Sequence, residues 1–195
     1  RQEDADVFVL NTCTVTGRSA AKCRKIIRHA VQEYPGLTVV VAGCYVQIDA
    51  DVIAGMPGVD YVLGNIEKGS IFDCFPGPGK RDKPLAKVQP FSGKDKAVGS
   101  PGRYPRHTRA AVKIQDGCDN RCSYCIVPFA RGPNRSRPEE EILADTRILI
   151  QQGFQEIVLT GVHVGDYGKD TDGMSMLPAL LRRIAGVQDL RRLRL

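Results

Sequence analysis

The apolar positions of the chain fall into short continuous runs and one-sided helical stripes. Residues 7–10, 37–41 and 59–64 form three such runs, a pattern typical of strands that are buried on both faces. Between the first two runs, residues 18–34 place apolar side chains at helical spacing, and Pro35-Gly36 ends that stripe. This alternation of strand and helix predicts an open α/β domain with a parallel sheet.

The same kind of pattern resumes further along the chain. Residues 110–114, 156–160 and 190–195 read as strands. Helices are predicted from just after Ser136, with Pro138 in the first turn, to about Gln152, and near 176–186. Ser136-x-x-Glu139 has the pattern of a capping box, so we expect Ser136 to cap the first of these helices. Repeated β/α units of this kind predict the beginning of a β/α barrel with about three of its strands. Because the chain also begins on a strand, we expect it to be an excerpt of a longer protein.

A basic, proline-rich stretch separates the two patterns. Residues 76–109 hold nine Lys/Arg and two Asp/Glu, so the net charge of +6 originates there. We therefore expect three parts: an N-terminal domain at residues 1–75, a basic Pro/Gly-rich linker at 76–108, and a second domain at 109–195. The basic stretch either is a solvated linker or follows a phosphate backbone.

The cysteine content indicates the redox state of the cellular compartment in which the protein functions. The chain has seven cysteines but no visible signal peptide, and no apolar run approaches the roughly 20 residues that cross a bilayer. These features favour a reducing, cytoplasmic location, metal ligation rather than disulfides, and no membrane partner.

Cys118, Cys122 and Cys125 form a C-x3-C-x2-C motif on one short loop. Three thiolates can hold three irons of a [4Fe–4S] cluster, and the fourth iron then stays open to a ligand such as S-adenosylmethionine, whereas electron-transfer ferredoxins fill all four positions with cysteine. A zinc knuckle or a chance cluster of cysteines is the alternative. Structural zinc sites use four protein ligands, and the only candidate that follows Cys125 is His163, standing alone.

The other four cysteines differ in their surroundings. Cys13 and Cys44 each follow a predicted parallel strand, and the carboxyl ends of such strands meet at one edge of the sheet. They are therefore candidate ligands of a second site, with buried structural cysteine as the alternative. Cys23 lies on the apolar face of the first helix and is expected in the core. Cys74 has apolar neighbours and is expected to be a core or partly exposed thiol.

Five motifs together resemble the methylthiotransferases of the radical S-adenosylmethionine superfamily, and the resemblance covers essentially the whole chain. Residues 113–118 (KIQDGC), 160–163 (TGVH) and the Cys44-Tyr45 pair are most similar to the branch that methylthiolates N6-threonylcarbamoyladenosine beside the tRNA anticodon. The five motifs are residues 11–16 (NTCTVT), residues 43–47 (GCYVQ), the three cysteines, residues 128–137 (PFARGPNRSR) and residues 157–161 (IVLTG).

This resemblance implies a fold and a set of cofactors. The N-terminal part would be a Rossmann/flavodoxin-like methylthiotransferase domain, and residues 109–195 would begin the partial TIM barrel of a radical S-adenosylmethionine core. Two [4Fe–4S] clusters and S-adenosylmethionine are implied. Cys118, Cys122 and Cys125 would be the catalytic ligands of one cluster. Cys13 and Cys44 would supply two of three ligands to the other cluster, which is incompletely ligated because the remaining cysteine motif lies upstream of residue 1.

The resemblance also implies the reaction and its partners. A methylthio group would be added to C2 of N6-threonylcarbamoyladenosine in the tRNA anticodon stem-loop, with electrons from a donor such as flavodoxin or ferredoxin. Tyr124 would line the adenine of the cofactor, and Thr160 and Gly161 would contact its methionine or ribose. Arg137, like its neighbours Arg131 and Arg135, would meet a cofactor carboxylate or RNA phosphate, with an ordinary surface arginine as the alternative.

Other functions stay open on the sequence alone. The same chemistry could act on another tRNA adenosine or on a ribosomal protein. A non-catalytic iron–sulfur or zinc module that binds nucleic acid is an alternative from another class. Residues 1–195 by themselves are expected to be inactive, since the second cluster would lack a ligand and the barrel would be open.

Overall fold

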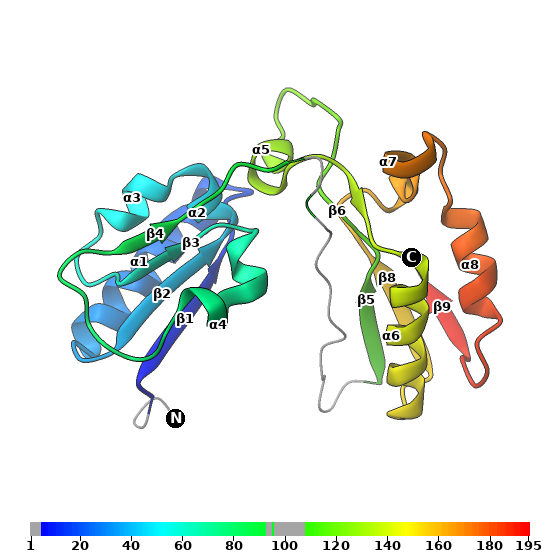
Figure 1. Cartoon of the computed structure of the whole chain (residues 1–195), viewed down its shortest axis with the longest axis horizontal. Coiled ribbons are helices and arrows are strands. Elements are labelled where there is room, and N and C mark those ends of the chain that lie inside the picture. Colours follow the sequence, from blue (N-terminus) through cyan, green and yellow to red (C-terminus); the bar gives the residue numbers. More distant parts are fainter. Residues whose placement is uncertain (1–4, 93–94, 96–107) are drawn as a thin grey trace. The chain divides into compact units, whose positions relative to one another are not determined.

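The computed structural model describes residues 5–92, 95 and 108–195, which form two compact units. The first unit consists of Arg1–Ser92 together with Arg121–Gly132, and the second of Gly93–Asn120 together with Pro133–Leu195. Figure 1 follows the chain through its elements. The first unit therefore includes a short segment that comes from within the second half of the sequence.

The first unit contains a four-stranded parallel sheet in the order β1-β2-β3-β4. The predicted open parallel sheet is thus confirmed, and its inner strand β2 is buried along its whole length, as its continuous apolar run indicated. Strand β4 was not predicted, because it falls within the segment expected to be a linker. The strands are β1 (Val7–Thr12), β2 (Thr38–Gly43), β3 (Tyr61–Leu63) and β4 (Leu85–Lys87).

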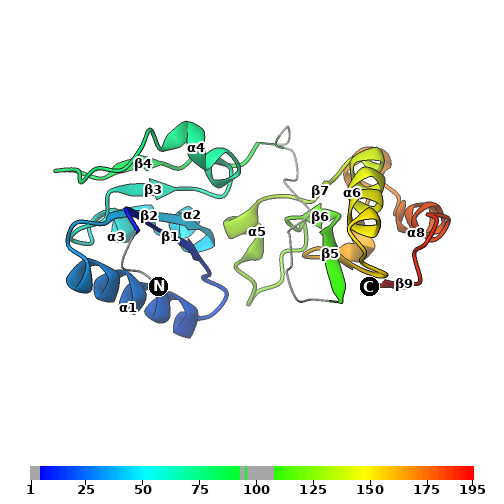
Figure 2. The same cartoon turned by 90° about the horizontal axis from the view of Figure 1, so that it is seen from below.

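Helices cover both faces of this sheet, and Figure 2 shows α1 and α4 on its opposite sides. Helix α1 (Gly17–Glu33) begins after Thr16, whose side chain accepts a hydrogen bond from Ser19 N, and it packs with α3 (Ala50–Ala54) on one face. Short helix α4 (Ile71–Cys74) packs on the other face, after the 3-10 turn η1 (Glu67–Ser70). Cys23 and Cys74 are both buried in these cores, which confirms Cys23 as a core residue and Cys74 as a core thiol.

A buried carboxylate ties the chain before β4 to the sheet. Asp60 is fully buried, and its Oδ2 lies 2.8 Å from both Val39 N and Lys80 Nζ. Its Oδ1 accepts a further hydrogen bond of 2.8 Å from Arg81 N. Residues 80 and 81 are thereby brought back to the sheet through polar contacts, which an apolar pattern does not reveal.

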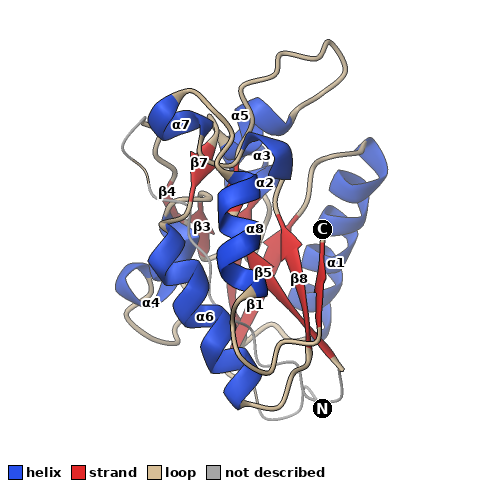
Figure 3. Cartoon of the chain, turned by 90° about the vertical axis from the view of Figure 1, so that its right-hand side faces the viewer, coloured by secondary structure: helices blue, strands red, loops and turns tan. Residues whose placement is uncertain are grey.

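The second unit has a three-stranded parallel sheet in the order β5-β8-β9, with β5 (Arg109–Lys113), β8 (Glu156–Thr160) and β9 (Arg192–Arg194). Helices α6 (Glu139–Gln151) and α8 (Leu177–Ala185) lie on the same side of this sheet (Figure 3) and enclose an apolar core with β5 and β8. The 3-10 turn η2 (Val164–Asp166) and helix α7 (Lys169–Asp172) follow β8. The predicted strands and helices of this half are confirmed, with three parallel strands as expected.

The predicted capping box at the start of α6 is wrong. Ser136 lies in β7 (Arg135–Ser136), which pairs antiparallel with β6 (Gln115–Asp116). Its hydroxyl forms a hydrogen bond with Asp170 Oδ1 and accepts one of 2.8 Å from Gly168 N, so it does not reach the helix. Pro138 is the residue at the N-cap, and no side chain of the described residues caps this helix.

Candidate functional site

Cys13 and Cys44 follow directly paired residues at the carboxyl edge of the first sheet. Thr12 and Gly43 are partners in the β1–β2 ladder. The Thr12 hydroxyl donates to Ala42 O at 2.7 Å and accepts from Tyr45 N at 3.2 Å, which joins the two strand ends. Gly43 has a φ of +105°, and a Cβ there would lie 2.6 Å from Asn11 Oδ1, so this turn requires glycine.

The two cysteines differ in exposure. Cys13 is exposed, so it is not the buried structural cysteine of the alternative interpretation. Cys44 is buried at the start of α2 (Cys44–Ile48), where its sulfur lies 3.4 Å from Asn65 Nδ2. Asn65 also donates to Ala130 O, which connects the surroundings of Cys44 to the segment that follows the three-cysteine motif. Ligation by Cys13 and Cys44 stays a prediction.

Residues 121–132 bring two cysteines of the motif into the first unit. Cys122 is exposed and Cys125 is half-buried, and Cys125 N donates to Cys122 O at 3.0 Å. Helix α5 (Val127–Arg131) follows them and packs against α2, with Ala130 buried. Cys122 and Cys125 therefore belong to the same compact unit as Cys13 and Cys44.

Cys118 belongs to the second unit, where it is buried after β6. Among the described residues, no group of three His, Cys, Asp or Glu side chains is arranged to hold a metal ion. Ligation of a cluster by Cys118, Cys122 and Cys125 stays a prediction. All seven cysteines lie in the described part of the chain, and each is a free thiol. Three uncommitted thiols within one short loop are a donor set that fits an iron–sulfur cluster.

The residues predicted to touch the cofactor occupy different settings. Tyr124 is 90% exposed, so its ring is available to a ligand. Thr160 is the last residue of β8 and is half-buried. Its side chain lies on the face of the strand opposite to Ile157 and Leu159, which pack in the core with α6 and α8. A Cβ on Gly161 would lie 2.8 Å from Gln115 Oε1, so glycine is required by the neighbouring side chain. Contact of these three residues with the cofactor stays a prediction.

Arg137 is buried rather than a surface residue. Its Nη2 lies 2.8 Å from Asp145 Oδ2, and its Nη1 donates to Lys113 O at 2.9 Å. This guanidinium therefore joins α6 to the carboxyl end of β5. Arg135 is also buried, with Nη2 3.7 Å from Asp116 Oδ2, whereas Arg131 is half-buried. A role of Arg137 towards the cofactor stays a prediction.

Charged groups cluster in the loop that follows β8. A hydrogen bond from Lys169 lowers the pKa of Asp166, with desolvation acting in the opposite direction and His163 adding to the lowering. His163 Nδ1 lies 2.7 Å from Asp166 Oδ2. Burial raises the pKa of Tyr167 to about 12, and its hydroxyl donates to Arg137 O at 3.0 Å.

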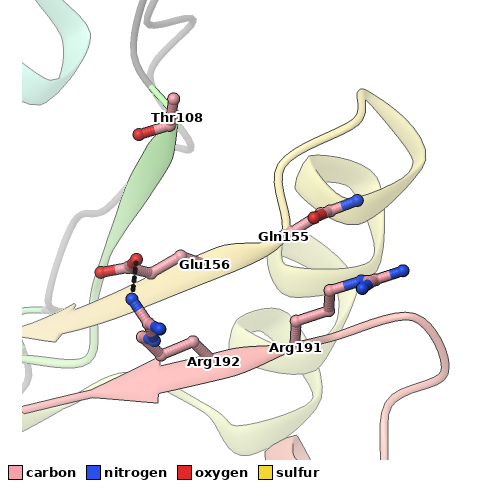
Figure 4. Close-up of a pocket in the computed structure, with 5 residues that line it drawn as sticks. All are labelled: Thr108, Gln155, Glu156, Arg191 and Arg192. Atoms are coloured by element: carbon pink, nitrogen blue, oxygen red, sulfur yellow. Dashed lines mark hydrogen bonds and ion pairs between the residues drawn. The ribbon is translucent and has the colours of Figure 1, made fainter.

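A cavity of about 250 Å³ lies at the opposite end of the second sheet (Figure 4). Its lining residues precede β5 or lie at the amino ends of β8 and β9, away from the strand end that carries Thr160. Arg192 pairs with Glu156 at 3.3 Å beside it. This cavity is therefore not part of the candidate site. It is lined by Thr108, Gln155, Glu156, Arg191 and Arg192.

Sequence reasoning missed two polar residues that organise these loops, Gln115 and Asn65. Gln115 directly follows the buried strand positions Ala110, Val112 and Ile114, and it is itself fully buried. A glutamine that continues an apolar strand immediately before a cysteine loop is a signal that could have identified it. No comparable signal marks Asn65.

No helix in the described parts of the chain has the length and apolar character needed to cross a membrane.

Comparisons with known proteins agree with the motifs. Residues 112–190 match the radical SAM superfamily profile, and residues 1–64 match the profile described as uncharacterized protein family UPF0004. The chain is 37% identical over 97% of its length to the threonylcarbamoyladenosine tRNA methylthiotransferase MtaB of Bacillus subtilis, covering 43% of that protein. For MtaB of Rickettsia prowazekii the identity is 33%, with 97% of this chain and 44% of the relative covered.

Relatives with a different named substrate also match. The tRNA-2-methylthio-N(6)-dimethylallyladenosine synthase of Clostridium botulinum is 32% identical over 99% of this chain and 44% of its own length. The chain spans less than half the length of each of these curated relatives.

Proposed function

We propose that the protein, a member of the radical S-adenosylmethionine methylthiotransferase family, adds a methylthio group to C2 of N6-threonylcarbamoyladenosine next to the tRNA anticodon. The observation that supports this substrate is the 37% identity, over nearly the whole chain, to a relative named for it. Matches to the dimethylallyladenosine enzymes are weaker and make another tRNA adenosine the second candidate.

The family implies S-adenosylmethionine and iron–sulfur chemistry. We assign Cys118, Cys122 and Cys125 to the cluster that binds S-adenosylmethionine, and Cys13 and Cys44 to a second [4Fe–4S] cluster. When bound, the first cluster supplies the electron that cleaves S-adenosylmethionine. The free thiols of all five residues support the assignment, since metal ligation requires thiols outside disulfides.

The protein chain contributes by holding the candidate ligand cysteines in fixed positions. The Thr12 and Gly43 contacts fix the turns that carry Cys13 and Cys44, while α5 anchors the segment of Cys122 and Cys125 against α2. A radical reaction needs its reactants held close together and shielded from competing reactions, which rigid turns favour.

We further propose the tRNA anticodon stem-loop as substrate, a flavodoxin or ferredoxin as electron donor, and a cytoplasmic location. Much of the basic stretch at residues 76–109 lies outside the described residues, so its contact with tRNA rests on its charge alone.

Mass spectrometry of tRNA nucleosides tests this function. Cells without the gene should lose 2-methylthio-N6-threonylcarbamoyladenosine and accumulate the precursor that lacks the methylthio group. The wild-type gene and a Cys74→Ala variant, altered only in the core, should restore the product, and Cys118→Ala should not. Loss of the methylthiolated dimethylallyladenosine instead would favour the second candidate substrate. Unchanged nucleosides, with stoichiometric zinc in the purified protein, would favour a non-catalytic module.

A further inference from the structure

Gln115 occupies an unusual position at the base of the loop that begins with Cys118. It lies in β6, is fully buried, and belongs to the same unit as Cys118 and the loop after β8. Buried carboxamides are stabilising only when their donors and acceptors find partners. The partners of this side chain therefore indicate what it holds in place.

The Gln115 oxygen contacts one loop and the nitrogen contacts the other. Oε1 accepts hydrogen bonds of 2.9 Å from both Val162 N and His163 N, in the loop after β8. Nε2 donates to Gly117 O, the residue before Cys118, at 2.6 Å. It also donates to Asn134 Oδ1 at 2.6 Å. Nε2 also lies 3.1 Å from Asp116 O. The oxygen therefore uses both of its acceptor positions, and the two hydrogens of the nitrogen share three acceptors.

The orientation of this carboxamide is determined by its surroundings. Backbone N–H groups can only donate, so the atom that faces Val162 and His163 must be the oxygen. The neighbouring residues extend the connection, because Asn134 Nδ2 donates to Asp166 O and Asn134 N donates to Asp119 Oδ1. The loop of Cys118 and the loop after β8 are thus joined through buried side chains.

We propose that Gln115 is a positioning residue of the cofactor site, which ties the backbone that carries Cys118 to the loop after β8 so that the two keep one relative position. The cofactor part of this inference rests on the proposed function, which assigns both stretches to S-adenosylmethionine and its cluster. The coupling of the two loops rests on the hydrogen bonds alone. Gly161 fits the same interpretation, since a side chain there would collide with the Gln115 oxygen.

Gln115→Met tests the proposal, because methionine keeps nearly the same volume and removes every one of these hydrogen bonds. Thr146→Val is the matched control. Thr146 is fully buried in the same unit, and within the described part of the chain its hydroxyl bonds inside α6, to Ile142 O. The protein expressed from its complete gene is reconstituted anaerobically with iron and sulfide. Hydrogen exchange of the Val162 and His163 amides and the dissociation constant of S-adenosylmethionine are then measured for each variant.

We expect the two amides to exchange about tenfold faster or more in Gln115→Met, and S-adenosylmethionine to bind about tenfold more weakly, because buried donors lose their acceptor. Thr146→Val should change neither beyond its effect on global stability. Equal exchange and affinity in the two variants would overturn the proposal. Faster exchange with unchanged affinity would refute the role at the cofactor site.

The experiment also covers a Gln115→Met variant that does not fold and a wild-type protein that does not bind S-adenosylmethionine. If Gln115→Met does not fold, Gly161→Ala displaces the same carboxamide from the other side and should speed exchange at Val162 and His163; normal exchange in that variant would overturn the proposal. If the wild-type protein binds no S-adenosylmethionine, the proposed function fails, while the exchange rates still decide whether Gln115 couples the two loops.

Discussion

Replacing Arg137 by alanine should cost about 3 kcal/mol in the free energy of unfolding. The Arg137 guanidinium is almost fully buried and lies 2.8 Å from Asp145 Oδ2, whose side chain is 14% exposed. Removing one partner of a buried pair typically costs about 3–5 kcal/mol, because the remaining charge is left uncompensated. We expect the lower end of this range, since water can reach Asp145 in part. The lost hydrogen bond to Lys113 O is included in this cost.

Equilibrium urea unfolding followed by far-ultraviolet circular dichroism measures this loss. A double-mutant cycle with Asp145→Ala should give a coupling energy of about 1–3 kcal/mol. Arg147→Ala is the control, because Arg147 is exposed on the same helix, and it should change stability by less than about 0.5 kcal/mol. A loss below about 1 kcal/mol for Arg137→Ala, with no coupling to Asp145, would refute the reasoning.

The same variants decide whether Arg137 also contacts the cofactor. Asp145→Ala breaks the shorter ion pair and keeps the guanidinium, which still lies 3.7 Å from Glu141 Oε2, whereas Arg137→Ala removes the guanidinium and both ion pairs. A direct cofactor contact predicts that S-adenosylmethionine binding falls far more in Arg137→Ala than in Asp145→Ala. A purely structural arginine predicts that both variants lose affinity in proportion to their loss of stability.

Three further predictions follow from the core and the buried polar groups. Cys23→Ala should keep the iron content of the reconstituted protein and cost about 1–2 kcal/mol, while Cys44→Ala should lose iron; iron analysis with the reverse result would contradict the ligand assignment. Asp60→Ala should cost about 3–5 kcal/mol in urea unfolding, because two backbone N–H groups and a lysine lose their acceptor, whereas the exposed Asp73→Ala should be nearly neutral. Tyr167 has a pKa raised from 10.0 to about 12 by burial, so stability present below pH 10 should fall as the pH rises towards 12; Tyr167→Phe should flatten this decline in unfolding measurements across that range, and an unchanged slope would refute it.

Much of the fold could be predicted because its strands are continuous apolar runs. β2 and β8 appear where the pattern placed them, and the parallel order follows from the helices between strands. β4 escaped prediction because it is held by backbone pairing and by the contacts of Asp60 rather than by an apolar run. The capping box at Ser136 failed because strand pairing places its hydroxyl against Asp170 and Gly168 instead.

The candidate site could be predicted as a set of residues but not as an arrangement. The spacing of Cys118, Cys122 and Cys125 is local and readable. That the last two belong to the first unit depends on α5 packing against α2 and on the Asn65 bond to Ala130, contacts between distant parts of the sequence. Likewise, the position of Gln115 at the end of an apolar strand indicates that it is buried, but it does not indicate which two loops its carboxamide joins.

The discontinuity of the first unit has a consequence for biosynthesis. A ribosome releases the four strands of the first sheet well before residues 121–132, which complete the same unit. A nascent chain that ends at Ser92 therefore exposes the surface of α2 that α5 later covers, and Asn65 still lacks its bond to Ala130. The cores on the two faces of the sheet contain no residue of 121–132, so the contact of α2 with α5 and the bond of Asn65 are the parts of this unit that form last during synthesis. Cys122 and Cys125 lie in the same segment as α5, so these two thiols are made at the same stage of synthesis as the contacts that complete the unit.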